Sequence, residues 1–255
     1  MKLKLVLATS IFFLFHSLAG LAATESSLLT VSEAGKAYAA GDYEKSVALY
    51  QSSIASGAVN GAILHNLGNA YYRLNRVGES VAAFRGASRF LPRDAEIASN
   101  LESARKRKTD SVDEKKRPLD QLVFWAGWAS LREYLILSSL AATIMMTFVL
   151  LRRLFSKVPF LLPLFFAVFS ILLGLTTMTK LFSWVDPAAA AVVTPEVSVK
   201  SGNGDSNVTL FVIHAGTEVV LGERRGEWIQ VSLADERKGW VREEFLTIVA
   251  SPALF

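Results

Sequence analysis

The chain contains no cysteine and only three histidines among its 255 residues. Without thiols it can form no disulfide, zinc–thiolate centre, cysteine nucleophile or lipid-modified cysteine. His65 and His214 have no acidic neighbours at metal-ligand spacing, and His16 lies in an apolar N-terminal run. A glycine-rich phosphate loop and a Gly-x-Ser-x-Gly elbow are also absent. We therefore predict a protein that is not an enzyme and that holds no metal or other cofactor.

The chain also carries little net charge, because its 27 Lys and Arg residues are nearly balanced by 23 Asp and Glu residues. The net charge of +4 is too small to indicate a nucleic-acid partner. What is abundant is apolar residues, at 51% of the chain. They concentrate in residues 5–23 and 134–184, while the remainder has the composition of a soluble protein. The sequence therefore predicts a membrane protein with soluble domains.

Two charge-free apolar runs, residues 134–151 and 158–179, flank a short basic loop at residues 152–157. Each run is close to the roughly 20 residues that a helix needs to cross a bilayer. The loop is too short to do more than reverse the chain. We therefore predict a transmembrane helical hairpin with a cytoplasmic loop. Because two crossings return the chain to the side that it left, the segments before and after the hairpin should share one compartment.

The N-terminus, residues 1–23, is typical of an export signal. It has a basic start, an apolar core and small residues that allow cleavage after Ala22 or Ala23. Retention of this segment as an anchor is an alternative, since the run is long enough. Either outcome carries the next domain across the membrane. We therefore expect a bacterial inner-membrane protein with both soluble domains in the periplasm.

Residues 27–104 repeat with a period of 34 residues: Ser-Val-Ala at 46–48 recurs at 80–82, and Tyr38 recurs as Tyr72. The period resembles that of the tetratricopeptide repeat, which consists of two antiparallel helices. The second copy carries the motif's residues at Leu67, Gly68, Tyr71, Phe84, Ala87 and Pro92. The first copy departs from it at Ala34 and Ser53. A third helix at residues 95–105 is expected to cap the array.

The resemblance implies a concave surface, formed by the first helix of each pair, that receives a peptide. The residues expected on it are Tyr38, His65, Asn66, Asn69, Tyr72, Arg73 and Asn100. Asn69 and Asn100 should face each other across adjacent repeats, where their amides could pair with an extended peptide backbone. The alternative is that these side chains are merely solvated.

Residues 105–118 are highly charged, with one aliphatic residue and no aromatic, which predicts a solvated linker. Contact of its lysines with anionic lipid is the alternative. Its basic residues oppose a periplasmic location, since Lys and Arg favour the cytoplasmic side, but the export signal decides the orientation. Residues 121–133 are predicted to form an interfacial helix, because Arg132 and Glu133 interrupt the apolar run.

After a second linker at residues 186–195, residues 196–250 predict a small all-β barrel. Short β-branched runs alternate with turns at 197–200, 210–213, 218–222, 228–233, 239–241 and 247–249. The order of these runs, with Gly239-Trp240-Val241 near the end, resembles the bacterial SH3-like domain. We expect Trp228 and Trp240 to pack in its core, since a barrel this small needs large rings. Exposure of both rings for ligand binding is the alternative.

The order of these parts resembles the BatE-like proteins of bacterial aerotolerance operons. It implies a multidomain membrane protein with all-α tetratricopeptide-like repeats, a transmembrane α-hairpin and a small all-β SH3-like barrel. The resemblance further implies a scaffold whose partners are a MoxR-type ATPase and membrane proteins with von Willebrand factor A domains, in stress or oxygen tolerance. A second hypothesis is a membrane protein that binds peptidoglycan through its barrel.

Overall fold

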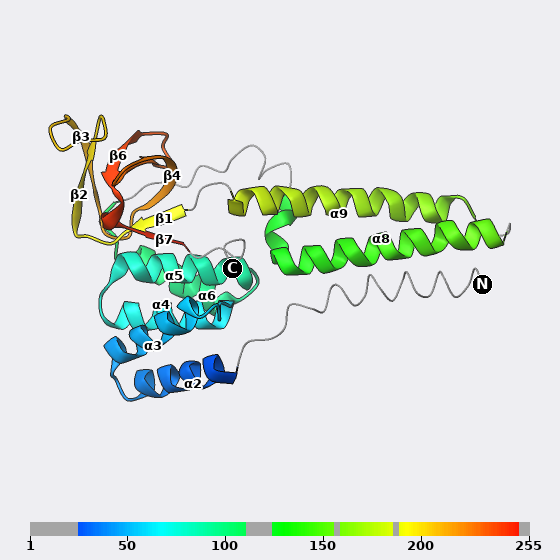
Figure 1. The fold of residues 1–255 in the computed structure, drawn as a ribbon, viewed down its shortest axis with the longest axis horizontal. Helices are drawn as coiled ribbons and strands as arrows, with labels where there is room; N and C mark the ends of the chain where they lie inside the picture. The colour runs from blue at the N-terminus through cyan, green and yellow to red at the C-terminus, as the bar shows by residue number, and fades with distance from the viewer. Residues whose placement is uncertain (1–24, 111–123, 156–158, 186–188, 250–255) are drawn as a thin grey trace. The chain divides into compact units, whose positions relative to one another are not determined.

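The computed structural model describes residues 25–110, 124–155, 159–185 and 189–249 (Figure 1). The described residues fall into two compact units. The hairpin unit comprises residues 125–182, and the composite unit combines the residues that precede and follow it in the chain. The predicted export signal lies outside the described residues.

Helices make up the first part of the composite unit. They are α2 (Glu25–Ala39), α3 (Tyr43–Ala55), α4 (Gly61–Arg73), α5 (Val77–Phe90) and α6 (Ala95–Arg105). Each packs against its neighbours along the chain, most closely within the pairs α2–α3 and α4–α5, with Tyr50, Leu67 and Tyr71 among the buried residues of their core. Asp42, Asn60 and Asp94 cap the N-termini of α3, α4 and α6 by accepting backbone N–H groups. The side chains predicted to line the groove belong to α2, α4 and α6 of this helical array.

A repeated hydrogen bond shows that the period of 34 residues is structural. The buried Ser46 hydroxyl donates to the Ala34 carbonyl at 3.0 Å, and the buried Ser80 hydroxyl donates to the Gly68 carbonyl at 3.1 Å. Both serines are fully buried, so each bond joins the two helices of a pair away from water. Two homologous helix pairs therefore stack, followed by α6.

The second part of the composite unit is an antiparallel sheet of seven strands. They are β1 (Ala189–Val192), β2 (Glu196–Lys200), β3 (Thr209–His214), β4 (Glu218–Arg225), β5 (Trp228–Ser232), β6 (Lys238–Arg242) and β7 (Leu246–Ile248). Their order is β3-β2-β6-β5-β4-β1-β7, and a 3-10 turn, η2 (Glu243–Phe245), precedes the last strand. The core contains Val197, Ile213, Val231 and Val241.

Strand β1 lies inside the region predicted as the linker 186–195. The prediction missed it because a run of alanines has a low β-propensity. Here the small side chains are what the position requires, since Ala190, Ala191 and Val192 are all fully buried. β1 pairs with β4 on one side and β7 on the other.

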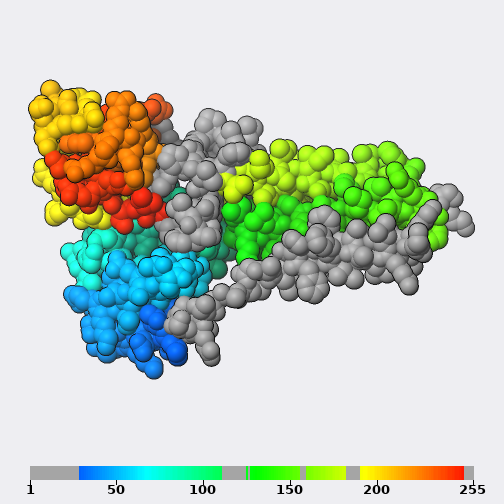
Figure 2. All heavy atoms as spheres, in the orientation of Figure 1, coloured from blue at the N-terminus to red at the C-terminus, as the bar shows by residue number. Residues whose placement is uncertain are grey.

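The two faces of β1 belong to different cores. Ala190 and Val192 pack in the core of the sheet, whereas Ala191 packs in a cluster with Val81, Phe84 and other residues of α5 and α6. Gly78 of α5 lies so close to β1 that a β-carbon on it would be 2.0 Å from the Val192 carbonyl oxygen. The helical array and the sheet are thus packed directly on each other, as Figure 2 shows for the cyan and red atoms.

Polar contacts surround this junction. The Glu218 carboxylate of β4 pairs with Arg85 of α5 and accepts from Arg105 Nε at 2.7 Å. Asp110 accepts from the His214 backbone N–H at 2.8 Å and from the Thr217 hydroxyl. Burial of Asp110 raises the pKa of its carboxyl, but these hydrogen bonds outweigh burial and leave the pKa below its ordinary value of 3.8. Asp110, which lies in the predicted linker 105–118, is therefore held against the sheet.

The hairpin unit consists of α8 (Leu131–Leu154) and the part of α9 (Leu161–Val185) that ends at residue 182. Both helices are long and apolar enough to cross a membrane, and only 11% and 17% of their most apolar windows are buried within the protein. Ser138 bonds to Thr177 at 2.9 Å and Phe148 stacks on Phe166, so the helices run antiparallel. Exposed apolar surface on this scale suits lipid rather than water.

Two boundaries differ from the prediction. The predicted interfacial helix at 121–133 is replaced in the described residues by a 3-10 turn, η1 (Phe124–Trp128), because Ser130 and Glu133 form a capping box that starts α8 at Leu131. Arg152 and Arg153, predicted in the loop, lie in the last turn of α8, where cations are favourable at the negative end of a helix dipole.

We predict that Gly78→Ala destabilises the composite unit by about 2 kcal/mol or more, since the new methyl group meets rigid backbone of β1. Thermal unfolding of the full chain in detergent measures this. Gly35→Ala is the control, because its nearest neighbour is the Tyr50 hydroxyl at 3.8 Å and alanine is the better helix former. Equal stability of the two variants would contradict the packing of α5 on β1.

Candidate functional site

Three predicted groove residues meet in one polar cluster. Asn100 of α6 donates through Nδ2 to His65 Nε2 at 2.9 Å and to Asn69 Oδ1 at 3.2 Å. Asn69 Nδ2 also lies 3.3 Å from His65 Nε2. For both amides to donate to it, Nε2 must carry no proton. The cluster therefore links α4 to α6, although its members are far apart in the sequence.

The two amides in this cluster keep unused hydrogen-bonding capacity. Both N–H groups of Asn100 form hydrogen bonds within the cluster. One N–H group and the carbonyl oxygen of Asn69 do so too. Within the described part of the chain, the second N–H of Asn69 and the Asn100 carbonyl oxygen have no partner. This donor and this acceptor, on two amides that are hydrogen-bonded to each other, are the groups that can pair with the C=O and N–H groups of a peptide backbone.

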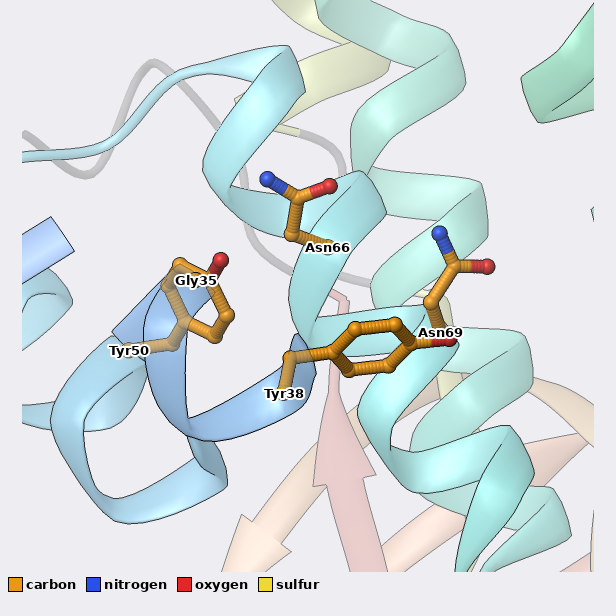
Figure 3. A pocket seen from close by; sticks show the side chains of 5 residues that line it. All are labelled: Gly35, Tyr38, Tyr50, Asn66 and Asn69. Carbon is orange, nitrogen blue, oxygen red and sulfur yellow. The ribbon is translucent and has the colours of Figure 1, made fainter. Parts of the chain in front are cut away.

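A pocket of about 110 Å³ lies beside the cluster, between the first helix pair and α4. It is lined by Gly35, Tyr38, Tyr50, Asn66 and Asn69 (Figure 3). Figure 3 shows the two tyrosine rings on the side of α2 and α3 and the two amides on α4. Burial raises the pKa of the Tyr50 hydroxyl, so this group stays protonated. An aromatic wall facing two amides can hold a small apolar or polar side chain of a bound segment.

Of the other two residues predicted in the groove, Tyr72 is covered by Arg107, whereas Arg73 bonds to Tyr38 at the pocket. The Arg107 guanidinium lies 3.5 Å from the centroid of the Tyr72 ring and donates to the Tyr72 carbonyl. Arg73 Nε donates to the Tyr38 hydroxyl at 3.4 Å, which holds the edge of the pocket. The structure thus brings Tyr38, His65, Asn66, Asn69 and Asn100 together around one surface and covers Tyr72.

Sequence reasoning missed three residues at this surface. Gly35 and Tyr50 line the pocket, and the Glu96 carboxylate lies 3.8 Å from His65 Nε2. Glu96 stands one helical turn before Asn100, so that spacing could have found it. The contact of Arg107 with the Tyr72 ring could not have been predicted, because nothing in a charged segment indicates which aromatic ring one of its arginines will cover.

Trp240 is buried, as expected, with only 7% of its surface exposed and the Arg225 guanidinium 5.2 Å from its ring. Trp228, contrary to our expectation, is only partly buried, and the Arg242 guanidinium lies 5.5 Å from its ring. Ile229 and Val241 belong to the main core of the sheet, and side chains alternate along a strand, so both tryptophans lie on the face opposite these two residues. Each ring thus forms a cation–π contact with an arginine.

Among the described residues, no group of three or more His, Asp or Glu side chains is placed to hold a metal ion. No protein-family model matches the chain, and no curated protein matches it.

Proposed function

We propose that the protein is a membrane-anchored adaptor that binds an extended segment of a partner protein in the groove of its helical array. The observation that carries the proposal is that two amides hydrogen-bonded to each other retain an unpaired donor on Asn69 and an unpaired acceptor on Asn100. A peptide backbone offers the complementary pair at every residue, so this arrangement recognises backbone without requiring a particular sequence. The adjoining pocket supplies selectivity for one side chain.

The helical array is proposed to be tetratricopeptide-like and the sheet SH3-like. The recurring Ser46 and Ser80 hydrogen bonds support the first assignment. The 3-10 turn η2 before the last strand and the antiparallel pairing of short strands support the second. On this assignment the sheet docks on α5 and α6, and the groove cluster makes none of the hydrogen bonds that join the array to the sheet.

Anchoring is proposed to place both parts of the composite unit in the periplasm of a bacterial inner membrane. α8 and α9 would cross the bilayer, with Trp125 and Trp128 at one interface and Arg152 and Arg153 at the cytoplasmic one. Residues before and after the hairpin form one compact unit, and such a unit requires that they lie on the same side. An even number of crossings satisfies that requirement.

The resemblance to BatE-like proteins suggests the class of partner. We propose membrane proteins with von Willebrand factor A domains and a MoxR-type ATPase system, acting in stress or oxygen tolerance. The role is that of a scaffold that holds partners near the membrane, with no reaction and no nucleic acid involved.

The groove assignment predicts that Asn69→Ala combined with Asn100→Ala weakens partner binding. Loss of two hydrogen bonds at about 1 kcal/mol each corresponds to roughly a 30-fold loss of affinity. Quantitative mass spectrometry of von Willebrand factor A-domain proteins and the MoxR-type ATPase, co-purified with the full chain from its native membrane, measures the change.

Asn203→Ala serves as the matched control, because it removes an exposed amide from a turn of the sheet. Membrane insertion of the double variant should equal that of the wild type, and its melting temperature should fall modestly, because the hydrogen bonds among His65, Asn69 and Asn100 are lost as well. Unchanged recovery of the partners by a folded double variant would exclude the groove as their binding site.

A second candidate function, peptidoglycan binding, is favoured by the outward position of Trp228 under Arg242. An aromatic ring beside a cation can stack on a sugar and pair with a carboxylate. We predict that the full chain in detergent does not sediment with isolated cell wall. Sedimentation that is lost in Trp228→Ala, but kept in Trp128→Ala outside the sheet, would instead establish this second function.

A further inference from the structure

The groove cluster of His65, Asn69 and Asn100 contains one group whose charge changes near neutral pH, the imidazole ring. Its Nε2 atom lies 2.9 Å from Asn100 Nδ2 and 3.3 Å from Asn69 Nδ2. Both amides can donate to Nε2 only while the ring is neutral and carries its proton on Nδ1. The His65 side chain is only 14% exposed, so these amides are its partners in place of water. The arrangement in the structure is therefore that of the neutral imidazole.

Protonation of the ring changes Nε2 from an acceptor into a donor. Three N–H groups would then face one another, and a half-turn of the Asn100 amide about its Cβ–Cγ bond relieves this by placing its oxygen beside Nε2. That oxygen would face Asn69 Oδ1 at about the present spacing of 3.2 Å, so Asn69 must make the same half-turn. Afterwards the Asn100 oxygen accepts from Nε2 and from Asn69 Nδ2, and the Asn69 oxygen also faces Nε2. The protonated ring thus has a complete alternative set of hydrogen bonds.

These two half-turns invert what the cluster offers to a bound segment. In the neutral cluster Asn69 presents an unpaired donor and Asn100 an unpaired acceptor. After the half-turns Asn69 presents an oxygen at the first position and Asn100 presents N–H groups at the second. A peptide C=O group bonded to Asn69 would then face an oxygen, and a peptide N–H group bonded to Asn100 would face another N–H group. Both hydrogen bonds to the segment are lost.

The surroundings of the ring favour its charged form. From α6 the Glu96 carboxylate lies 3.8 Å from His65 Nε2, and a nearby opposite charge stabilises a cation. From α5 the Phe84 ring lies with its centroid 5.8 Å from that of the imidazole, within the range at which an aromatic ring attracts a cation. On the side of α2 and α3 the titratable groups are Tyr38, Tyr50 and, bonded to Tyr38, Arg73. Tyrosine and arginine side chains do not change charge between about pH 5 and pH 8, whereas histidine does.

We infer that protonation of His65 turns the amides of Asn69 and Asn100, so that the groove holds an extended segment at neutral pH and releases it in acid. This inference rests on the proposed function of the groove and adds its regulation. The bistable element is the pair of amides, because each of its two arrangements satisfies one charge state of the ring. Partner binding is thereby coupled to the acidity of the compartment that contains the groove.

Nuclear magnetic resonance of the full chain in detergent, with ¹⁵N-labelled histidine and asparagine, tests the switch without a ligand. Between about pH 8 and pH 5, His65 should gain a proton and the side-chain amide signals of Asn69 and Asn100 should shift with the same midpoint. In His65→Gln these signals should not move, because the Gln oxygen accepts from both amides at every pH. His214→Gln is the matched control, since it removes an imidazole bonded to Asp110 and should leave the shift intact. Amide signals that stay in place while His65 gains a proton would overturn the inference.

Release of the partners tests the consequence for binding. The full chain is isolated from its native membrane at about pH 8 and washed at about pH 5.5, a step that spans the titration of a histidine. Quantitative mass spectrometry measures the retained von Willebrand factor A-domain proteins and MoxR-type ATPase. We expect acid to weaken binding by about 30-fold, as for the loss of two hydrogen bonds, in the wild type and in His214→Gln but not in His65→Gln.

The two proposals fail in different ways. Partners that are recovered at the higher pH and stay bound in acid would overturn the switch and leave the groove as their binding site. An equal loss of partners from His65→Gln in acid would also overturn the switch, since that variant has no imidazole in the cluster. If no partner is recovered even at the higher pH, the proposed function is wrong, and the switch falls with it.

Discussion

Strand β1 is buried on both faces, and the composite unit depends on this arrangement. Its short side chains fill the core of the sheet on one face and the cluster beneath α5 on the other. Only glycine at position 78 lets the helix backbone come this close. The ion pairs of Glu218 with Arg85 and Arg105 lie around an apolar contact and fix its orientation, while the buried apolar area supplies most of the free energy. The helical array and the sheet thus form one compact unit.

This junction restricts the path of the chain. The helical array precedes α8 and the sheet follows α9, so the two halves can pack only if the intervening chain returns to its starting side. A hairpin of two apolar helices does this, and its exposed surface suits lipid. The sheet docks on α5 and α6, and the cluster of His65, Asn69 and Asn100 makes none of the hydrogen bonds that join the array to the sheet.

Local patterns in the sequence predicted most of the elements. The 34-residue period gave the helix pairs, and the third helix at 95–105 coincides with α6. Six of the strands lie within a few residues of the predicted runs, since alternation and turn residues are local signals. Three groove residues, His65, Asn69 and Asn100, meet as the repeat geometry predicts.

The failures concern contacts between distant segments. The alanines of β1 have the composition of a linker and become a strand because a helix and two strands enclose them. Asp110 belongs to a charged segment whose contact with His214 no local pattern indicates. Trp240 is buried as predicted, whereas Trp228 is only partly buried, because the need of a small barrel for large rings does not say which face of a strand each ring occupies.

The central claim is that both halves of the composite unit lie on the same side of the membrane. Single cysteines in the otherwise cysteine-free chain test it: Leu29→Cys before α8, Phe155→Cys after α8 and Val220→Cys in the sheet, all at exposed positions. A membrane-impermeant maleimide added to cells with a permeable outer membrane should label residues 29 and 220. Residue 155 should react only after the inner membrane is opened. Labelling of residues 29 and 220 from opposite sides would contradict the account.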